Sequence, residues 1–134
     1  MKHVMVIDDE RDILTCLEEL LTGEGYRVTG VVSGAEALDV LPNDPPDLVL
    51  LDLRMPQMSG LELLQAIRRT HPDLPIVVCS ALDSYRNDFE LVSAKVAAFL
   101  DKPMDLDNVL TTVRRLIGEG EVSKLGLGAD KADG

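Results

Sequence analysis

Hydrophobic residues along this chain follow two different spacings. Short, mainly apolar runs recur along it, each bounded on at least one side by a charged residue or proline. Runs of this length without polar alternation are typical of strands buried on both faces of a parallel sheet. They predict strands at residues 4–7, 28–32, 48–51, 76–79 and 96–100.

Between these runs, apolar residues recur every three or four positions, which is the pattern of an amphipathic helix packed on a sheet. Ser33 with Glu36 and Ser59 with Glu62 have the capping-box spacing that marks a helix start. The pattern predicts helices around residues 13–21, 35–41, 61–67, 84–94 and 106–117. The fourth has the least regular stripe, because polar residues surround its apolar positions.

Strand and helix thus alternate five times along the chain. This alternation predicts an α/β domain with a doubly wound, five-stranded parallel sheet, right-handed crossovers, and helices on both faces. We expect strand order 2-1-3-4-5. Residues 118–134 lack periodicity and contain five glycines, so we expect one domain over residues 1–117, followed by a flexible tail or the start of a linker.

Composition narrows the classes of function. The 134 residues carry a formal net charge of -11, which disfavours a direct nucleic-acid surface, because such surfaces need clustered lysine and arginine. No apolar run approaches the length of a membrane span, and the N-terminus has no cleavage pattern of a signal peptide. We therefore expect a cytoplasmic protein without membrane contact.

The cysteines and histidines indicate no chemistry of their own. Cys16 falls in a helical pattern and Cys79 in an apolar run, where free thiols act as small hydrophobic groups. His3 and His71 have no neighbouring set of metal ligands, and we expect both at the surface.

Polar side chains collect at the carboxyl ends of the predicted strands. Asp8 and Asp9 follow the first strand, Asp52 the third, Ser80 the fourth and Lys102 the fifth. Open parallel sheets bind ligands at this edge. Close carboxylates repel by about 4 kcal/mol at about 4 Å when the effective dielectric constant is about 20, so a positive group is expected among them. The all-oxygen set favours a hard cation such as Mg²⁺, since Lys102 offsets only part of the charge.

Four landmarks stand in order along the chain: Asp8-Asp9, the run from Asp52 to Gly60, Ser80-Ala81 and Lys102-Pro103. Together they resemble the receiver domain of bacterial response regulators, over about residues 1–117. The resemblance implies a flavodoxin-like (βα)5 fold and a role in two-component signal transduction.

By this resemblance Asp52 accepts a phosphoryl group from a histidine kinase or a histidine phosphotransfer protein. Asp9, Asp52 and the main-chain carbonyl of Arg54 would bind Mg²⁺ or Mn²⁺ directly, and Asp8 would act mainly through a metal-bound water. The domain would be a signalling phosphoacceptor rather than an enzyme, although it would assist its own phosphotransfer and dephosphorylation.

The resemblance also implies a switch. Ser80, the main chain of Ala81 and Lys102 would contact phosphoryl oxygens, and Phe99 would rotate into space that Ser80 vacates. The output surface would be formed by the fourth helix, the fifth strand and the fifth helix. It would act on a downstream protein or on an output domain outside this sequence, and homodimer formation on phosphorylation is left open.

Other functions fit the sequence less well. A flavin-binding module would need a phosphate-binding loop after the first strand, where Asp8, Asp9 and Glu10 would repel a phosphate. An aspartyl phosphohydrolase would have a second aspartate two residues after the nucleophile, where this chain has Arg54. A receiver-like docking module that is never phosphorylated remains the alternative. The chain also departs from the family pattern at Lys95, where a glycine is usual.

Overall fold

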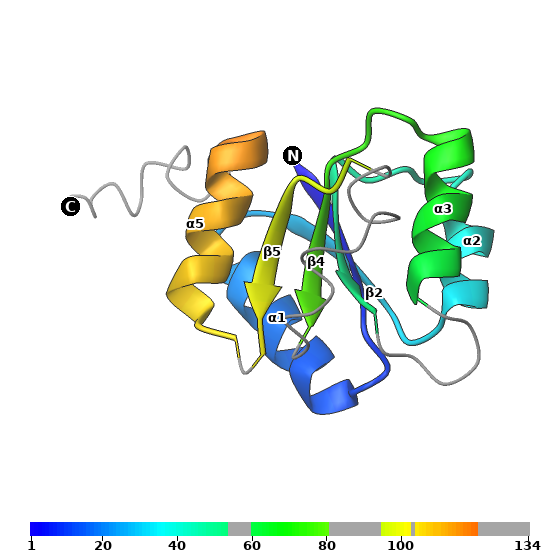
Figure 1. Ribbon diagram of the computed structural model, residues 1–134. Helices are drawn as coiled ribbons and strands as arrows, with labels where there is room; N and C mark the ends of the chain where they lie inside the picture. The colour runs from blue at the N-terminus through cyan, green and yellow to red at the C-terminus, as the bar shows by residue number, and fades with distance from the viewer. Residues whose placement is uncertain (54–59, 81–94, 103, 121–134) are drawn as a thin grey trace.

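The computed structural model describes residues 1–53, 60–80, 95–102 and 104–120. Within them, five parallel strands form one sheet in the predicted order, β2-β1-β3-β4-β5 (Figure 1). The strands are β1 (His3–Ile7), β2 (Arg27–Val31), β3 (Leu48–Asp52), β4 (Ile76–Ser80) and β5 (Ala98–Asp101). The helices are α1 (Arg11–Gly23), α2 (Gly34–Val40), α3 (Gly60–Thr70) and α5 (Leu106–Ile117). The helix expected at 84–94 lies outside the described residues.

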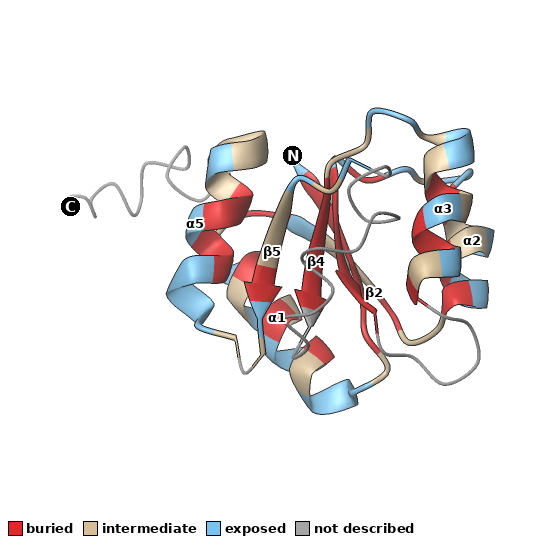
Figure 2. Cartoon of the chain, viewed as in Figure 1, coloured by how far each residue is buried: buried red, intermediate tan, exposed pale blue. Residues whose placement is uncertain are grey.

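The sheet has a hydrophobic core on each face (Figure 2). Met5 and Ile7 of β1 belong to the core under α2 and α3, whereas Val4 and Val6 belong to the core under α1 and α5. Successive side chains of a strand point to opposite faces, so a strand covered on both sides must be apolar at every position. This explains the unbroken apolar runs in the sequence.

The outer strands are less buried than the sequence pattern suggests. Every residue of β1 and β3 is buried, whereas β2 and β5 each have one buried residue, one exposed residue and otherwise partly buried ones. These two strands lie at the edges of the sheet, where each has one neighbouring strand instead of two. β5 also begins at Ala98, later than the predicted start of its apolar run.

The predicted capping interaction at the start of α2 is confirmed. Ser33 is the N-cap residue, and its hydroxyl accepts a hydrogen bond of 3.1 Å from the main-chain nitrogen of Glu36. The Glu36 carboxylate accepts in turn from the main-chain nitrogen of Val32, at 3.1 Å. The second predicted box begins at Ser59, which lies outside the described residues.

His3 is buried, so its predicted surface position is wrong. Only 2% of the residue is exposed, and its Nε2 atom lies 2.7 Å from the Thr29 hydroxyl. Its main-chain nitrogen donates to the Asp47 carboxylate at 2.8 Å. The physical reason is that His3 begins an inner strand, which β2 and β3 flank on either side.

Among the described helices, none is long and apolar enough to span a membrane.

Candidate functional site

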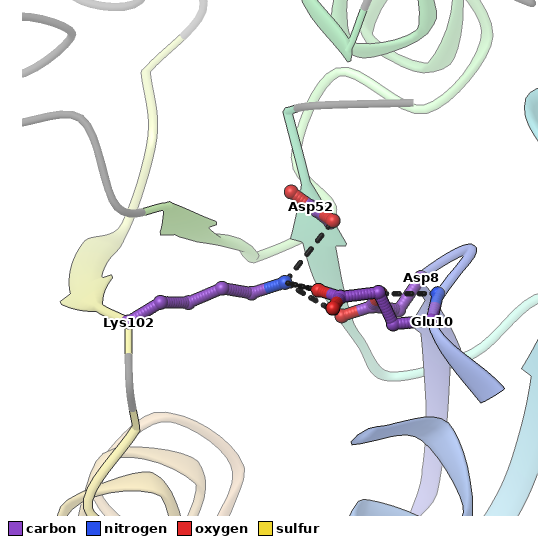
Figure 3. Close-up of polar contacts among 4 residues, drawn as sticks. All are labelled: Asp8, Glu10, Asp52 and Lys102. Atoms are coloured by element: carbon purple, nitrogen blue, oxygen red, sulfur yellow. Dashed lines mark hydrogen bonds and ion pairs between the residues drawn. The ribbon is translucent and has the colours of Figure 1, made fainter. Parts of the chain in front are cut away.

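The carboxyl edge of the sheet brings together residues that are distant in sequence. Asp8 directly follows β1, Asp52 is the last residue of β3, and Lys102 directly follows β5. β4 lies between β3 and β5, so the long side chain of Lys102 extends across its end toward the two aspartates (Figure 3). This is the convergence that the sequence predicted for these three residues.

The Lys102 ammonium is surrounded by three carboxylates. Its Nζ atom lies 3.0 Å from Oδ2 of Asp8, 3.1 Å from Oδ2 of Asp52 and 3.3 Å from Oε1 of Glu10 (Figure 3). An ammonium has three N–H donors and no acceptor. The three carboxylates therefore match its full donating capacity.

Burial makes these charges interact strongly. The side chains of Asp8 and Asp52 are each 3% exposed and that of Lys102 12%, whereas Glu10 is 61% exposed. Burial raises the pKa of Asp8, although hydrogen bonds from the main chain of Glu10 and from Lys102 partly oppose the shift. Burial lowers the pKa of Lys102, but its hydrogen bonds and ion pairs with Asp8 and Asp52 outweigh burial and raise that pKa. Lys102 is therefore charged at neutral pH.

The carboxylates fit a divalent cation. Asp8, Glu10 and Asp52 each offer an oxygen, and these oxygens all lie within 4.8 Å of one another. Three carboxylates beside one ammonium leave an excess of negative charge, and an all-oxygen donor set suits a hard cation such as Mg²⁺. The donor chemistry of the residues present thus matches the predicted metal.

Glu10 is a member of this cluster that the sequence analysis did not assign to the site. Its main-chain nitrogen donates to Oδ1 of Asp8 at 2.9 Å, which turns the chain back directly after the strand. Asp9, a predicted direct ligand, is partly buried and is not in the cluster formed by the described carboxylates. The available signal for Glu10 was an acidic residue two positions after the aspartate that follows the first strand.

The other predicted site residues are only partly visible. Ser80 ends β4, and its main chain is paired in register with Asp101. Its side chain, like Arg54 and Ala81, lies outside what the structure describes. Phe99 lies on β5, is partly buried, and packs against the core under α2 and α3.

Gly60 closes the segment that follows Asp52. Its main-chain nitrogen donates to the Leu53 carbonyl at 3.1 Å, so the chain returns to the end of β3 before α3 begins. A Cβ atom on Gly60 would overlap the main chain of Leu53. Glycine is thus required by close main-chain approach next to the acidic cluster.

Comparison with known sequences identifies the family. A family profile described as the response regulator receiver domain matches residues 4–114. The chain is 38% identical over 115 residues to response regulator MprA of Mycobacterium sp. strain KMS, covering 86% of this chain and 50% of the relative. MprA of Mycobacterium avium strain 104 is 37% identical with the same coverage. The chain therefore spans about half the length of these curated relatives.

Solved structures agree with this assignment. Chemotaxis protein CheY4 of Vibrio cholerae superposes with a TM-score of 0.82 at 27% identity, covering 87% of this chain and 99% of that one. Response regulator TrrA of Thermotoga maritima, solved in complex with Mg(2+)-BeF, gives 0.80 at 34% identity, covering 87% and 100%. Together with the acidic cluster and its lysine at the carboxyl edge of the sheet, these likenesses show that the chain belongs to the response regulator receiver domains of two-component systems.

Proposed function

We propose that this domain accepts a phosphoryl group on Asp52 from a phosphorylated histidine of a kinase or phosphotransfer protein, in a reaction that requires Mg²⁺ or Mn²⁺. The observation that carries the proposal is the environment of Asp52. Its side chain is 3% exposed at the carboxyl edge of the sheet, and Lys102 donates to it at 3.1 Å. A buried carboxylate held by an ammonium beside further carboxylates is suited to accept a phosphoryl group next to a cation.

The transfer balances as a simple displacement. One carboxylate oxygen of Asp52 forms a bond to phosphorus while the bond from phosphorus to the donor imidazole nitrogen breaks, and that electron pair stays on the nitrogen. Negative charge on the equatorial oxygens needs fixed positive groups nearby. Lys102 supplies one, because its Nζ atom already lies between Asp8 and Asp52.

The divalent cation would add positive charge beside the reacting oxygens. The carboxylates of Asp8 and Asp52 lie close enough together to hold it. Direct ligation by Asp9 and by the carbonyl of Arg54 is proposed from the family resemblance. TrrA, solved in complex with Mg(2+)-BeF, supports magnesium in a relative of the same fold.

The proposed switch runs from Ser80 through Phe99 to a surface that includes β5 and α5. Phe99 is partly buried against the core, and α5 packs on β5. Phe99 lacks a phenolic hydroxyl, so its contribution would come from packing alone. We expect Phe99→Ala to weaken output while Asp52 is still phosphorylated. Output would pass to a protein partner or an output domain, with homodimer formation on phosphorylation as an open possibility to test.

Intact-mass spectrometry after incubation with acetyl phosphate tests the phosphoacceptor. The expected result is a single phosphoryl adduct that requires Mg²⁺ and is absent from Asp52→Asn. Asp12→Asn is the matched control, because Asp12 is an exposed carboxylate in the first turn of α1. If a known receiver is labelled under the same conditions and this chain is not, the phosphorylation-independent docking module becomes the better explanation.

Metal titration of the same reaction tests the acidic cluster. Asp9→Ala removes a metal ligand that the family resemblance implies, but it leaves the carboxylates of Asp8, Glu10 and Asp52 in place. We expect Asp9→Ala to abolish the Mg²⁺ dependence together with labelling. An unchanged titration would place the metal on the other carboxylates.

A further inference from the structure

Glu10 is the exposed member of the acidic cluster, and its side chain does not cap the helix that follows it. Glu10 is the N-cap residue of α1, yet its side chain makes no capping hydrogen bond. Instead its carboxylate lies 3.3 Å from the Lys102 ammonium, across 92 residues of sequence. The side chain is therefore directed to the site rather than to its own helix.

We propose that Glu10 is a positioning residue that holds Lys102 in the unphosphorylated site, and that Lys102 exchanges Glu10 for a phosphoryl oxygen when Asp52 is phosphorylated. This inference rests on the proposed function above. It assigns the Glu10 carboxylate to the lysine and leaves the metal to Asp8, Asp52 and the ligands implied by the family. Glu10 would then influence how readily the site accepts a phosphoryl group.

The number of donors limits how many acceptors Lys102 can serve. The Lys102 ammonium has three N–H groups, and the three carboxylates occupy all of them. Phosphorylation neutralises the Asp52 carboxylate and places several negatively charged phosphoryl oxygens beside the same nitrogen. The donor that Asp52 now accepts can pass to one of these oxygens. Lys102 can donate to a second one only by giving up Asp8 or Glu10.

Glu10 is the partner that is released most easily. Its oxygen is the farthest of the three from Nζ, at 3.3 Å, and its side chain is 61% exposed. A carboxylate that returns to water loses little, whereas Asp8, which is 3% exposed, would be left charged and unpaired in the interior. The exchange therefore leaves the buried contact between Lys102 and Asp8 in place.

The main chain of Glu10 is held while its side chain is free to move. Its nitrogen donates to Asp8 at 2.9 Å, and its carbonyl accepts from the nitrogen of Leu14 at 3.0 Å. Rotation about the side-chain bonds can thus release Lys102 without disturbing α1 or the end of β1. Substitution of Glu10 should consequently leave the fold intact.

The inference predicts that Glu10 slows phosphorylation. With saturating Mg²⁺, Glu10→Gln should raise the initial rate of labelling by acetyl phosphate about two- to fivefold, the range expected for release of a partly exposed ion pair. Asp12→Asn should have a smaller effect, although it removes the same charge from the same turn of chain.

A double-mutant cycle separates positioning of Lys102 from repulsion of the anionic donor. The initial rate is measured for the native chain, Glu10→Gln, Lys102→Met and the variant with both changes. We expect Glu10→Gln to accelerate labelling only where Lys102 is present. Equal acceleration in both backgrounds, or none in the native background, would overturn the inference.

A readout independent of phosphotransfer completes the test. In the metal-free chain, the ¹⁵N resonance of the Lys102 ammonium should shift in Glu10→Gln and stay unchanged in Asp12→Asn. An unchanged resonance in Glu10→Gln would contradict the pairing. Failure of the native chain to be labelled would count against the proposed function instead, so the two failures are distinguishable.

Discussion

The Lys102 ammonium lies 3.0 Å from the Asp8 carboxylate, although 94 residues separate them in sequence. Asp8 is 2% exposed, and an ionised carboxylate is costly to bury without a partner. Lys102 thus stabilises the edge of the sheet as well as serving the proposed chemistry.

We predict that Lys102→Met lowers the free energy of unfolding by about 2–4 kcal/mol at pH 7 without divalent cations, because Asp8 and Asp52 lose their cation. Urea denaturation with a chelator present measures the change. Lys2→Met is the control, because Lys2 is exposed and outside the site.

The loss of unfolding free energy caused by Lys102→Met should become smaller as the pH falls. Burial already raises the pKa of Asp8 above its ordinary 3.8, and loss of Lys102 removes an interaction that lowers it. Between pH 7 and pH 3.8, Asp8 of the folded variant therefore binds more protons than Asp8 of the unfolded variant. Lowering the pH over this range stabilises the folded variant. A loss that grows over this range would contradict the prediction.

Lys95 should be a source of strain. Its φ angle is 59°, a left-handed conformation that costs a residue with a side chain about 1–2 kcal/mol. Lys95→Gly should raise stability by about 0.5–1 kcal/mol, because glycine's extra freedom in the unfolded chain offsets part of the relief. Lys95→Ala keeps the Cβ atom and should change little. An equal gain in both variants would implicate the lysine charge instead.

The hydrogen bond from Tyr26 to Gly118 should tie the end of the domain to its core. The Tyr26 hydroxyl donates to the Gly118 carbonyl at 2.6 Å, so contacts extend at least one residue past the boundary predicted at 117. Tyr26→Phe should cost about 1 kcal/mol in thermal or urea denaturation. In a chain ending at Ile117 the same substitution should have little further effect. An undiminished cost there would show that the hydroxyl acts elsewhere.

The two cysteines should differ sharply in reactivity. Cys16 is exposed, whereas Cys79 is buried and desolvation raises its pKa to about 12. A thiol reagent at pH 8 should modify one thiol in the native protein and both in denaturant, because the thiolate is the reactive form. Cys16→Ser should remove the fast reaction. A fast reaction that persists in Cys16→Ser would show that the core around Cys79 opens.

Much of the fold could be read from local pattern. The runs 4–7 and 48–51 are apolar at every position because helices cover both faces of the strands they form. The alternation of strands and helices also predicted that Asp8, Asp52 and Lys102 would lie at one edge of the sheet, because parallel strands end on the same side. These features depend on the spacing of apolar residues and on the alternation of strands and helices, and both can be read from the amino-acid sequence.

Tertiary structure alone decided other features. The burial of His3 depends on the strands that flank it, and the partial exposure of β2 and β5 on their lack of a second neighbour. The main chain of Glu10 is held locally by Asp8, but its side chain joins the site through Lys102, which lies 92 residues away in sequence. Periodicity reports which face of an element is covered. The hydrogen-bond or ion-pair partner of a polar side chain often lies far away in the sequence. Only folding brings the two residues together.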